Sequence, residues 1–127
     1  MSHFSRILVV DDERDILQVF ERILRSEGYV VLTASDGPTA LGIVRREVVD
    51  VMLLDLAMPG MNGLAVLRAV RALPCDAAVV VISAFVDATS EAEAKRLGAV
   101  AVLSKPPDIG ELLRLCGELT HSSRATS

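Results

Sequence analysis

Residues 51–64 read VMLLDLAMPGMNGL, and this stretch sets the pattern for the rest of the chain. Its first four residues are apolar and run directly into one carboxylate, Asp55, after which turn residues follow at 58–60 and 62–63. A continuous apolar run bounded by turn residues is typical of a strand that is buried on both faces. An ionised carboxylate at the end of such a strand is costly without compensation. Other parts of the chain must therefore supply a compensating group.

The size and composition of the chain are those of one globular domain. It has 127 residues, of which 51% are hydrophobic and 24% are charged. A chain of this length buries roughly two thirds of its unfolded surface and folds without a disulfide or a structural metal. We expect one domain over residues 1–119 and a frayed polar tail over residues 120–127.

Charge and composition argue against several classes of partner. The net charge is −4 without a basic cluster, and aromatic residues make up only 3%, so direct binding of nucleic acid is disfavoured. No apolar run approaches the roughly 20 residues of a membrane span, and the N-terminus lacks the apolar core of a signal peptide. Cys75 and Cys116 match no metal or redox spacing. We therefore expect a cytoplasmic protein with two reduced structural thiols and no contact with membranes.

Strands and helices alternate along the whole chain. Apolar, β-rich runs predict strands over residues 7–10, 29–34, 77–82 and 100–103, besides the one at 51–54. We expect the second strand at an edge of the sheet, because it becomes polar at its end, and the fifth strand in a buried position. Apolar residues at helical spacing predict a helix after each strand. Helix starts are marked by Pro38 and Asp108, and helix ends by Gly28, Pro74 and Gly98.

This alternation predicts the fold class. Near-continuous apolar strands separated by helices are typical of an α/β protein with a parallel sheet covered by helices on both faces. Right-handed crossovers then bring the carboxyl ends of all strands to one edge of the sheet, where ligands bind in folds of this kind. Four of the five strands end there in a polar group: Asp11 and Asp12, Asp55, Ser83 and Lys105.

The chemistry of these five residues is coherent. Three carboxylates in one crevice repel each other unless a cation is present, and Mg²⁺, with Mn²⁺ as an alternative, favours such oxygen ligands. Lys105 offers a point charge for a phosphoryl oxygen, and Ser83 offers a hydroxyl. Taken singly, each residue has a structural explanation as a helix cap, a turn former, a loop hydroxyl or a surface lysine. Their joint placement favours a carboxylate nucleophile that accepts a phosphoryl group.

Four segments carry a family resemblance. ILVVDDE, DVMLLDLAMPGMNGL, VVVISA and LGAVAVLSKP occur in this order and resemble the receiver domain of two-component response regulators, of the chemotaxis-regulator type, over residues 5–119. The resemblance implies a flavodoxin-like (βα)₅ fold with strand order 2-1-3-4-5. It also implies that the chain is no turnover enzyme, but catalyses its own phosphorylation and a slow autodephosphorylation.

The resemblance assigns a role to each residue of the acidic cluster. Asp55 resembles the phosphoacceptor, which takes its phosphoryl group from a phosphohistidine on a sensor histidine kinase or a histidine phosphotransfer protein. Asp12 resembles a direct Mg²⁺ ligand together with Asp55, and Asp11 a ligand that acts through water. The backbone carbonyl of Ala57 would complete the protein ligands.

Lys105 and Ser83 complete the implied machinery. Lys105 would bind a phosphoryl oxygen of the aspartyl phosphate, and Ser83 would move toward the phosphoryl group and couple chemistry to conformation. The resemblance also implies a cis bond between Lys105 and Pro106. Residues 86–119 correspond to the surface through which the family usually contacts downstream protein targets, and a homodimer through this surface is left open.

The chain departs from the family pattern at two places. The aromatic residue that often precedes the lysine by three positions is Val102 here, so we expect signalling to depend on Ser83 and on the following loop with Phe85. The positions two past Asp55 and two past Ser83 are Ala57 and Phe85, and neither side chain can orient a hydrolytic water. We therefore expect slow self-dephosphorylation.

Three functions stay open at this point. The favoured one is a phosphoryl-accepting switch or relay protein, either a stand-alone regulator or a receiver module of a longer chain. The second is an aspartate-nucleophile phosphatase of similar topology, which is disfavoured because such enzymes usually place the nucleophile after the first strand. The third is a receiver-like module that binds partners without phosphorylation, which the complete set of site residues disfavours.

Overall fold

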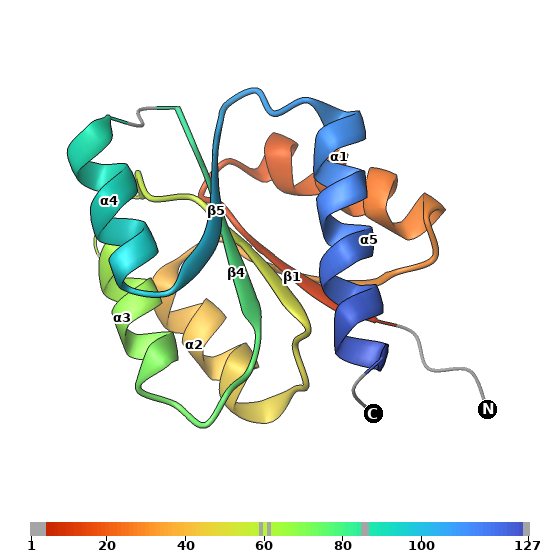
Figure 1. Ribbon diagram of the computed structural model, residues 1–127, viewed down its shortest axis with the longest axis horizontal. Coiled ribbons are helices and arrows are strands. Elements are labelled where there is room, and N and C mark those ends of the chain that lie inside the picture. The colour runs from red at the N-terminus through yellow and green to blue at the C-terminus, as the bar shows by residue number, and fades with distance from the viewer. Residues whose placement is uncertain (1–4, 59, 61, 85–86, 126–127) are drawn as a thin grey trace.

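A computed structural model describes residues 5–58, 60, 62–84 and 87–125 of the chain. Within these residues five strands alternate with five helices, as the sequence predicts (Figure 1). The elements are β1 (Arg6–Val10), α1 (Arg14–Ser26), β2 (Val30–Ala34), α2 (Gly37–Arg46), β3 (Val51–Leu54), α3 (Gly63–Arg71), β4 (Ala78–Ser83), α4 (Ala88–Arg96), β5 (Ala99–Ser104) and α5 (Ile109–Ala125).

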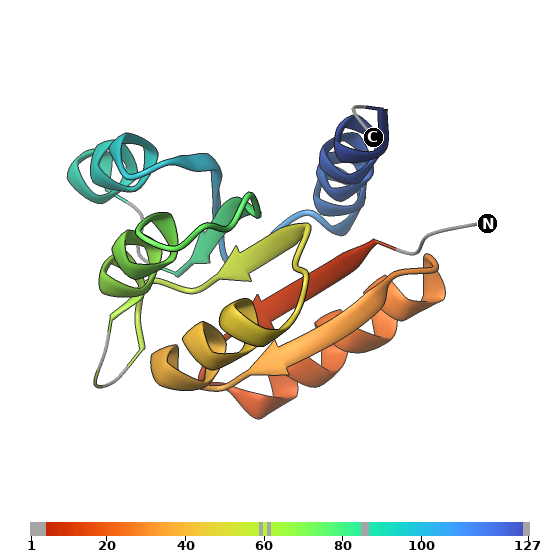
Figure 2. The same ribbon diagram turned by 90° about the horizontal axis from the view of Figure 1, so that it is seen from below.

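The strands form one parallel sheet in the order β2-β1-β3-β4-β5, which confirms the predicted fold class and topology. Figure 2 shows β1, β2 and β3 running in the same direction, so their carboxyl ends lie at one edge. Helices α1 and α5 cover one face of the sheet, and α2, α3 and α4 cover the other (Figure 1). Each face has its own hydrophobic cluster, to which alternate residues of the central strands contribute.

Local signals set the ends of the helices. Asp108 accepts a hydrogen bond from the N–H of Glu111 through its side chain (2.9 Å), so it caps α5 as predicted. Pro38 lies in the first turn of α2, where its missing N–H costs no helical hydrogen bond. Gly28 and Gly98 follow α1 and α4 with φ angles of 94° and 104°, a backbone conformation that residues other than glycine rarely adopt. These predicted boundaries are confirmed.

β2 and β5 lie at the two edges of the sheet, as the predicted strand order requires. The prediction that the fifth strand is buried is wrong, because most residues of β5 are partly or fully exposed. The register between β4 and β5 shifts between Val79 and Val80, and Val100 of β5 is 50% exposed. An apolar run cannot by itself distinguish a central strand from an edge strand whose outer side is open, which is why this prediction is wrong.

The predicted frayed tail is helical instead. Helix α5 continues through Ala125, and the last predicted tail residues, 126 and 127, lie outside the described part of the chain. Thr120 is buried, and its hydroxyl donates to the carbonyl of Cys116 (2.8 Å), which satisfies the polar group inside the helix. Among the described helices, none combines the length and apolar character that a membrane crossing requires.

Both cysteines are free thiols, as predicted. Cys116 is fully buried under the α1–α5 face of the sheet, whereas Cys75 is half-buried in the loop before β4. Burial raises the pKa of the Cys116 thiol to about 11, so this side chain is neutral and unreactive near neutral pH.

Candidate functional site

Backbone hydrogen bonds bring the strand-end carboxylates together. The N–H of Asp55 donates to the carbonyl of Val10 (3.0 Å), and the N–H of Asp11 donates to the carbonyl of Ala34 (3.1 Å). These bonds extend the sheet by one residue beyond β1 and β3. Asp11, Asp12 and Asp55 each offer a carboxylate oxygen, and these oxygens lie within 4.8 Å of one another. Asp11 and Asp55 are buried, and Asp12 is exposed.

Lys105 supplies the compensation that a buried carboxylate requires. Its Nζ lies 2.7 Å from Oδ2 of Asp11 and 3.2 Å from Oδ2 of Asp55, and its side chain is only 14% exposed. Burial by itself lowers the pKa of Lys105, but the hydrogen bonds and charges of the two aspartates outweigh it and raise the pKa above its ordinary value. Lys105 is therefore a firmly protonated cation between two buried carboxylates.

The second oxygen of each buried carboxylate is held by the backbone. Oδ1 of Asp11 accepts from the N–H of Glu13 (2.9 Å), and Oδ1 of Asp55 accepts from the N–H of Ala57 (3.0 Å). Each carboxylate thus has one oxygen fixed by its own loop and one directed at Lys105. The orientation of both groups is set before any ligand arrives, which favours catalysis by positioning.

Ser83 lies at the end of β4, next to the lysine. The N–H of Lys105 donates to the carbonyl of Ser83 (3.0 Å). Ser83 is 1% exposed, and within the described residues its Oγ has no hydrogen-bond partner. Leaving a buried hydroxyl without a hydrogen bond costs free energy. The Ser83 hydroxyl would regain a hydrogen bond by donating to an acceptor that enters the site.

The donor set fits a hard divalent cation. Carboxylate oxygens from three aspartates at this spacing are the ligands that Mg²⁺ and Mn²⁺ prefer, and Asp12 is accessible from solvent. Ala57 lies beside Asp55 through its N–H, and it is exposed. The predicted residues Asp11, Asp12, Asp55, Ala57, Ser83 and Lys105 all lie at this one edge of the sheet.

The structure adds a residue that the sequence prediction missed. Oε1 of Glu13 lies 3.8 Å from Nζ of Lys105, although the Glu13 side chain is 63% exposed. Its position directly after the aspartate pair was the available signal.

Of the residues that depart from the family pattern, Val102 is half-buried against the α2–α4 side of the sheet, and Phe85 lies outside the described residues.

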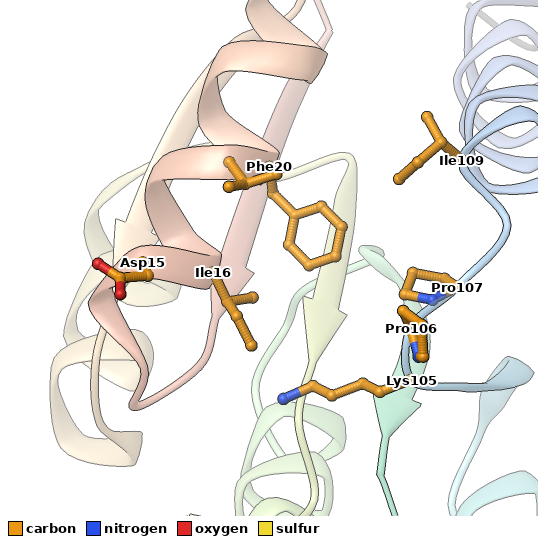
Figure 3. A pocket seen from close by; sticks show the side chains of 8 residues that line it. Asp15, Ile16, Phe20, Lys105, Pro106, Pro107 and Ile109 are labelled. Carbon is orange, nitrogen blue, oxygen red and sulfur yellow. The ribbon is translucent and has the colours of Figure 1, made fainter.

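An apolar pocket of about 490 Å³, called here the α1–α5 pocket, borders the site (Figure 3). Figure 3 shows Phe20 and Ile16 of α1 facing Pro106, Pro107 and Ile109, with the Lys105 side chain at the same opening. The bond between Lys105 and Pro106 is cis, as expected. The pocket was not predicted from the sequence, because it joins residues about 90 positions apart. It is lined by Asp15, Ile16, Val19, Phe20, Lys105, Pro106, Pro107 and Ile109.

A family model for the response regulator receiver domain matches residues 7–116. The chain belongs to this family. Among similar proteins, the receiver domain is 35% identical over 108 residues to sporulation initiation phosphotransferase F of Bacillus subtilis, covering 85% of this chain and 87% of that protein. It is 41% identical over 106 residues to response regulator PleD of Caulobacter vibrioides, covering 82% of this chain but only 23% of PleD.

Solved structures agree with this assignment. The chemotaxis protein CheY4 of Vibrio cholerae is 29% identical, with a TM-score of 0.87 over 92% of this receiver domain and 99% of that chain. A CheY-like receiver domain protein from Methanospirillum hungatei is 26% identical, with a TM-score of 0.90 over 97% and 99% of the two chains. The family and the fold inferred from the sequence are both confirmed.

Proposed function

We propose that this receiver domain accepts a phosphoryl group on Asp55 from a phosphohistidine of a sensor histidine kinase or a histidine phosphotransfer protein. A carboxylate oxygen of Asp55 attacks the phosphorus, the P–N bond breaks, and the imidazole leaves with the bonding electrons and takes up a proton. The observation that carries this proposal is the placement of Lys105 Nζ between Asp11 and Asp55, with a carboxylate oriented by the N–H of Ala57.

Each residue of the site has a proposed part in this transfer. Asp12, Asp55 and the carbonyl of Ala57 would hold Mg²⁺ directly, and Asp11 would hold it through water. The metal, when bound, offsets the charge that gathers on the transferring phosphoryl oxygens. Lys105 exchanges its contact with the Asp55 carboxylate for a phosphoryl oxygen, because an ammonium group prefers the more highly charged acceptor.

Ser83 links the chemistry to the output. Its buried Oγ, which has no partner among the described residues, donates a hydrogen bond to the phosphoryl group, and this movement draws the end of β4 toward the site. Downstream proteins read the shift at the surface formed by α4, β5 and α5, within residues 86–119, where Val100 is half exposed. Because position 102 is a valine, the switch operates without an aromatic side chain there.

The α1–α5 pocket gives the phosphodonor protein a place to dock. A phosphohistidine reaches Asp55 only if the donor covers the edge of the sheet at Lys105, and the pocket begins at that residue. Val19 and Ile109, which line it, are 54% and 37% exposed, so the pocket presents apolar surface to solvent next to the site. An apolar helix face of the donor would bury both.

Relatives support a relay or switch over the other functions considered. Sporulation initiation phosphotransferase F is named as a phosphotransferase, and this chain covers 87% of its length. An aspartate-nucleophile phosphatase is disfavoured because the oriented acceptor follows β3, and a binding module without phosphorylation is disfavoured because the complete acidic cluster and lysine are present.

Phosphorylation by a small phosphodonor tests the proposal directly. Wild type and Asp55→Asn are incubated with acetyl phosphate and Mg²⁺, and the intact mass is measured. We expect one phosphoryl adduct on wild type and none on Asp55→Asn. Wild type should also form no adduct when a chelator removes the metal before the phosphodonor is added. An adduct that persists in Asp55→Asn would overturn the assignment of the acceptor.

A further inference from the structure

We infer that Gly63 is a positioning residue for the phosphoacceptor: the absence of a side chain at this position lets α3 press against the backbone of Asp55 and Leu56. The inference rests on the proposed function, because it concerns the geometry of the same site. Gly63 is the first residue of α3, eight positions after Asp55.

The contact leaves no room for a side chain. A Cβ atom at Gly63 would lie 2.4 Å from Cα of Leu56 and 2.5 Å from the carbonyl oxygen of Asp55. Both are backbone atoms, so no rotation of a side chain relieves the overlap. The φ angle of Gly63 is not positive, unlike those of Gly28, Gly60 and Gly98. Glycine is therefore required here by space and not by backbone conformation.

A hydrogen bond joins the same two segments. The N–H of Gly63 donates to the carbonyl of Leu56 (3.0 Å). The next residue after Leu56 is Ala57, whose N–H holds Oδ1 of Asp55. The start of α3 therefore fixes the peptide that orients the acceptor carboxylate.

A methyl group at Gly63 would move the loop rather than the helix. Val66, Leu67 and Val70 anchor α3 in the core, and Asn62 caps it by accepting from the N–H of Ala65 (2.9 Å). Ordinary van der Waals contact begins near 3.4 Å, so the loop at Leu56 must yield by about 1 Å. A displacement of about 1 Å at a reacting group costs on the order of 10²-fold in rate.

The test compares Gly63→Ala with Gly117→Ala. Gly117 lies in α5, and a Cβ there meets nothing within 4 Å, so it controls for the substitution itself. Three quantities are measured for both variants and wild type: the rate of phosphorylation by acetyl phosphate, the affinity for Mn²⁺ alone by electron paramagnetic resonance, and the amide chemical shifts. Far-ultraviolet circular dichroism reports whether each variant is folded.

We expect Gly63→Ala to be folded, to accept phosphate about 10²-fold more slowly, to bind Mn²⁺ at least tenfold more weakly, and to shift the amide of Ala57 while β1 and α5 are unchanged. Gly117→Ala should match wild type throughout. Wild-type rate and Mn²⁺ affinity in Gly63→Ala would overturn the inference while leaving the proposed function intact. Failure of wild type itself to accept phosphate would instead overturn the proposed function.

A variant that does not fold is also informative. Gly63→Ala would then be refolded in trimethylamine N-oxide, which favours compact states, and the Mn²⁺ measurement repeated against wild type in the same solvent. Weakened Mn²⁺ binding in the refolded variant supports a positioning role. Wild-type affinity after refolding, or a variant that stays unfolded, would show that Gly63 serves the fold and not the site.

Discussion

Nζ of Lys105 lies 2.7 Å from Oδ2 of Asp11, although the two residues are 94 positions apart in the chain. The same nitrogen contacts Asp55, so one cation compensates two buried carboxylates. This relationship explains how the sheet edge holds its negative charge before a metal or a phosphoryl group arrives. Lys105 therefore stabilises the buried carboxylates in the free protein, and in the proposed transfer it also binds the phosphoryl group.

Replacement of Lys105 by methionine should destabilise the protein when no divalent cation is present. Two buried carboxylates would lose their partner, at a cost of about 1–3 kcal/mol in the free energy of unfolding. Mg²⁺ should restore more stability to this variant than to wild type, because the metal becomes the remaining source of compensation. Urea unfolding with and without Mg²⁺ measures both effects.

Lys95→Met is the matched control. Lys95, the other lysine of the chain, pairs with Glu91 on the exposed side of α4 at 3.2 Å. An exposed pair of this kind contributes little, so its loss should change stability by about 0.5 kcal/mol or less. Equal effects of the two substitutions would contradict a special role for Lys105.

Alkaline pH should destabilise the fold through Cys116. Its pKa is about 11 when folded, against a reference value of 9.0, so above pH 9 the unfolded chain binds fewer protons than the folded one. Stability must then fall as the pH rises, by about 1.4 kcal/mol per pH unit from this group, until the folded thiol also ionises. Urea unfolding at pH 8.5 and 10.5 should show a larger loss for wild type than for Cys116→Ala. Parallel losses in the two proteins would refute the assignment.

Substitution of Val19 by aspartate should block the protein phosphodonor and spare the small one. Val19 lies on the rim of the α1–α5 pocket and is 54% exposed, so the fold tolerates a charge there. With a histidine kinase that phosphorylates the wild-type chain, transfer should slow at least tenfold, because a docked apolar face would have to bury the carboxylate. The rate with acetyl phosphate should not change.

Val48→Asp provides the comparison for this prediction. Val48 is 66% exposed and lines a different pocket, next to the loop that precedes β3. Kinase transfer to Val48→Asp should match wild type. A similar slowing in both variants would point to a general effect of added negative charge, and would remove the argument for docking at the α1–α5 pocket.

The phosphoryl group should be long-lived and should become shorter-lived when a polar side chain is placed at position 57. Ala57 is exposed beside the acceptor and cannot hold a hydrolytic water. Ala57→Asn should accelerate loss of the adduct several-fold, as followed by intact mass after removal of the phosphodonor. Phe85→Glu, at a position outside the described residues, should act in the same direction. Unchanged lifetimes in both variants would contradict the explanation, and Ala72→Asn in the loop after α3 is the neutral control.

Local patterns in the sequence predicted the secondary structure, the fold class and most of the site residues. The apolar runs predicted five strands, and the alternation with helices predicted a parallel sheet, because strand and helix periodicity are properties of neighbouring residues. The sheet topology then placed Asp11, Asp12, Asp55, Ser83 and Lys105 at one edge, since all carboxyl ends of parallel strands lie together. The strand order, in contrast, came from family resemblance and not from these patterns.

Only the tertiary structure decided how the parts meet. It left β5 partly exposed, continued α5 through Ala125, and directed Lys105 at one oxygen each of Asp11 and Asp55. It also revealed the contact of Gly63 with the backbone beside the acceptor. Such features depend on packing between segments far apart in the chain, where the same residue types are compatible with several distances. The sequence by itself determined which groups reach the site, and the packed structure determined their spacing and orientation.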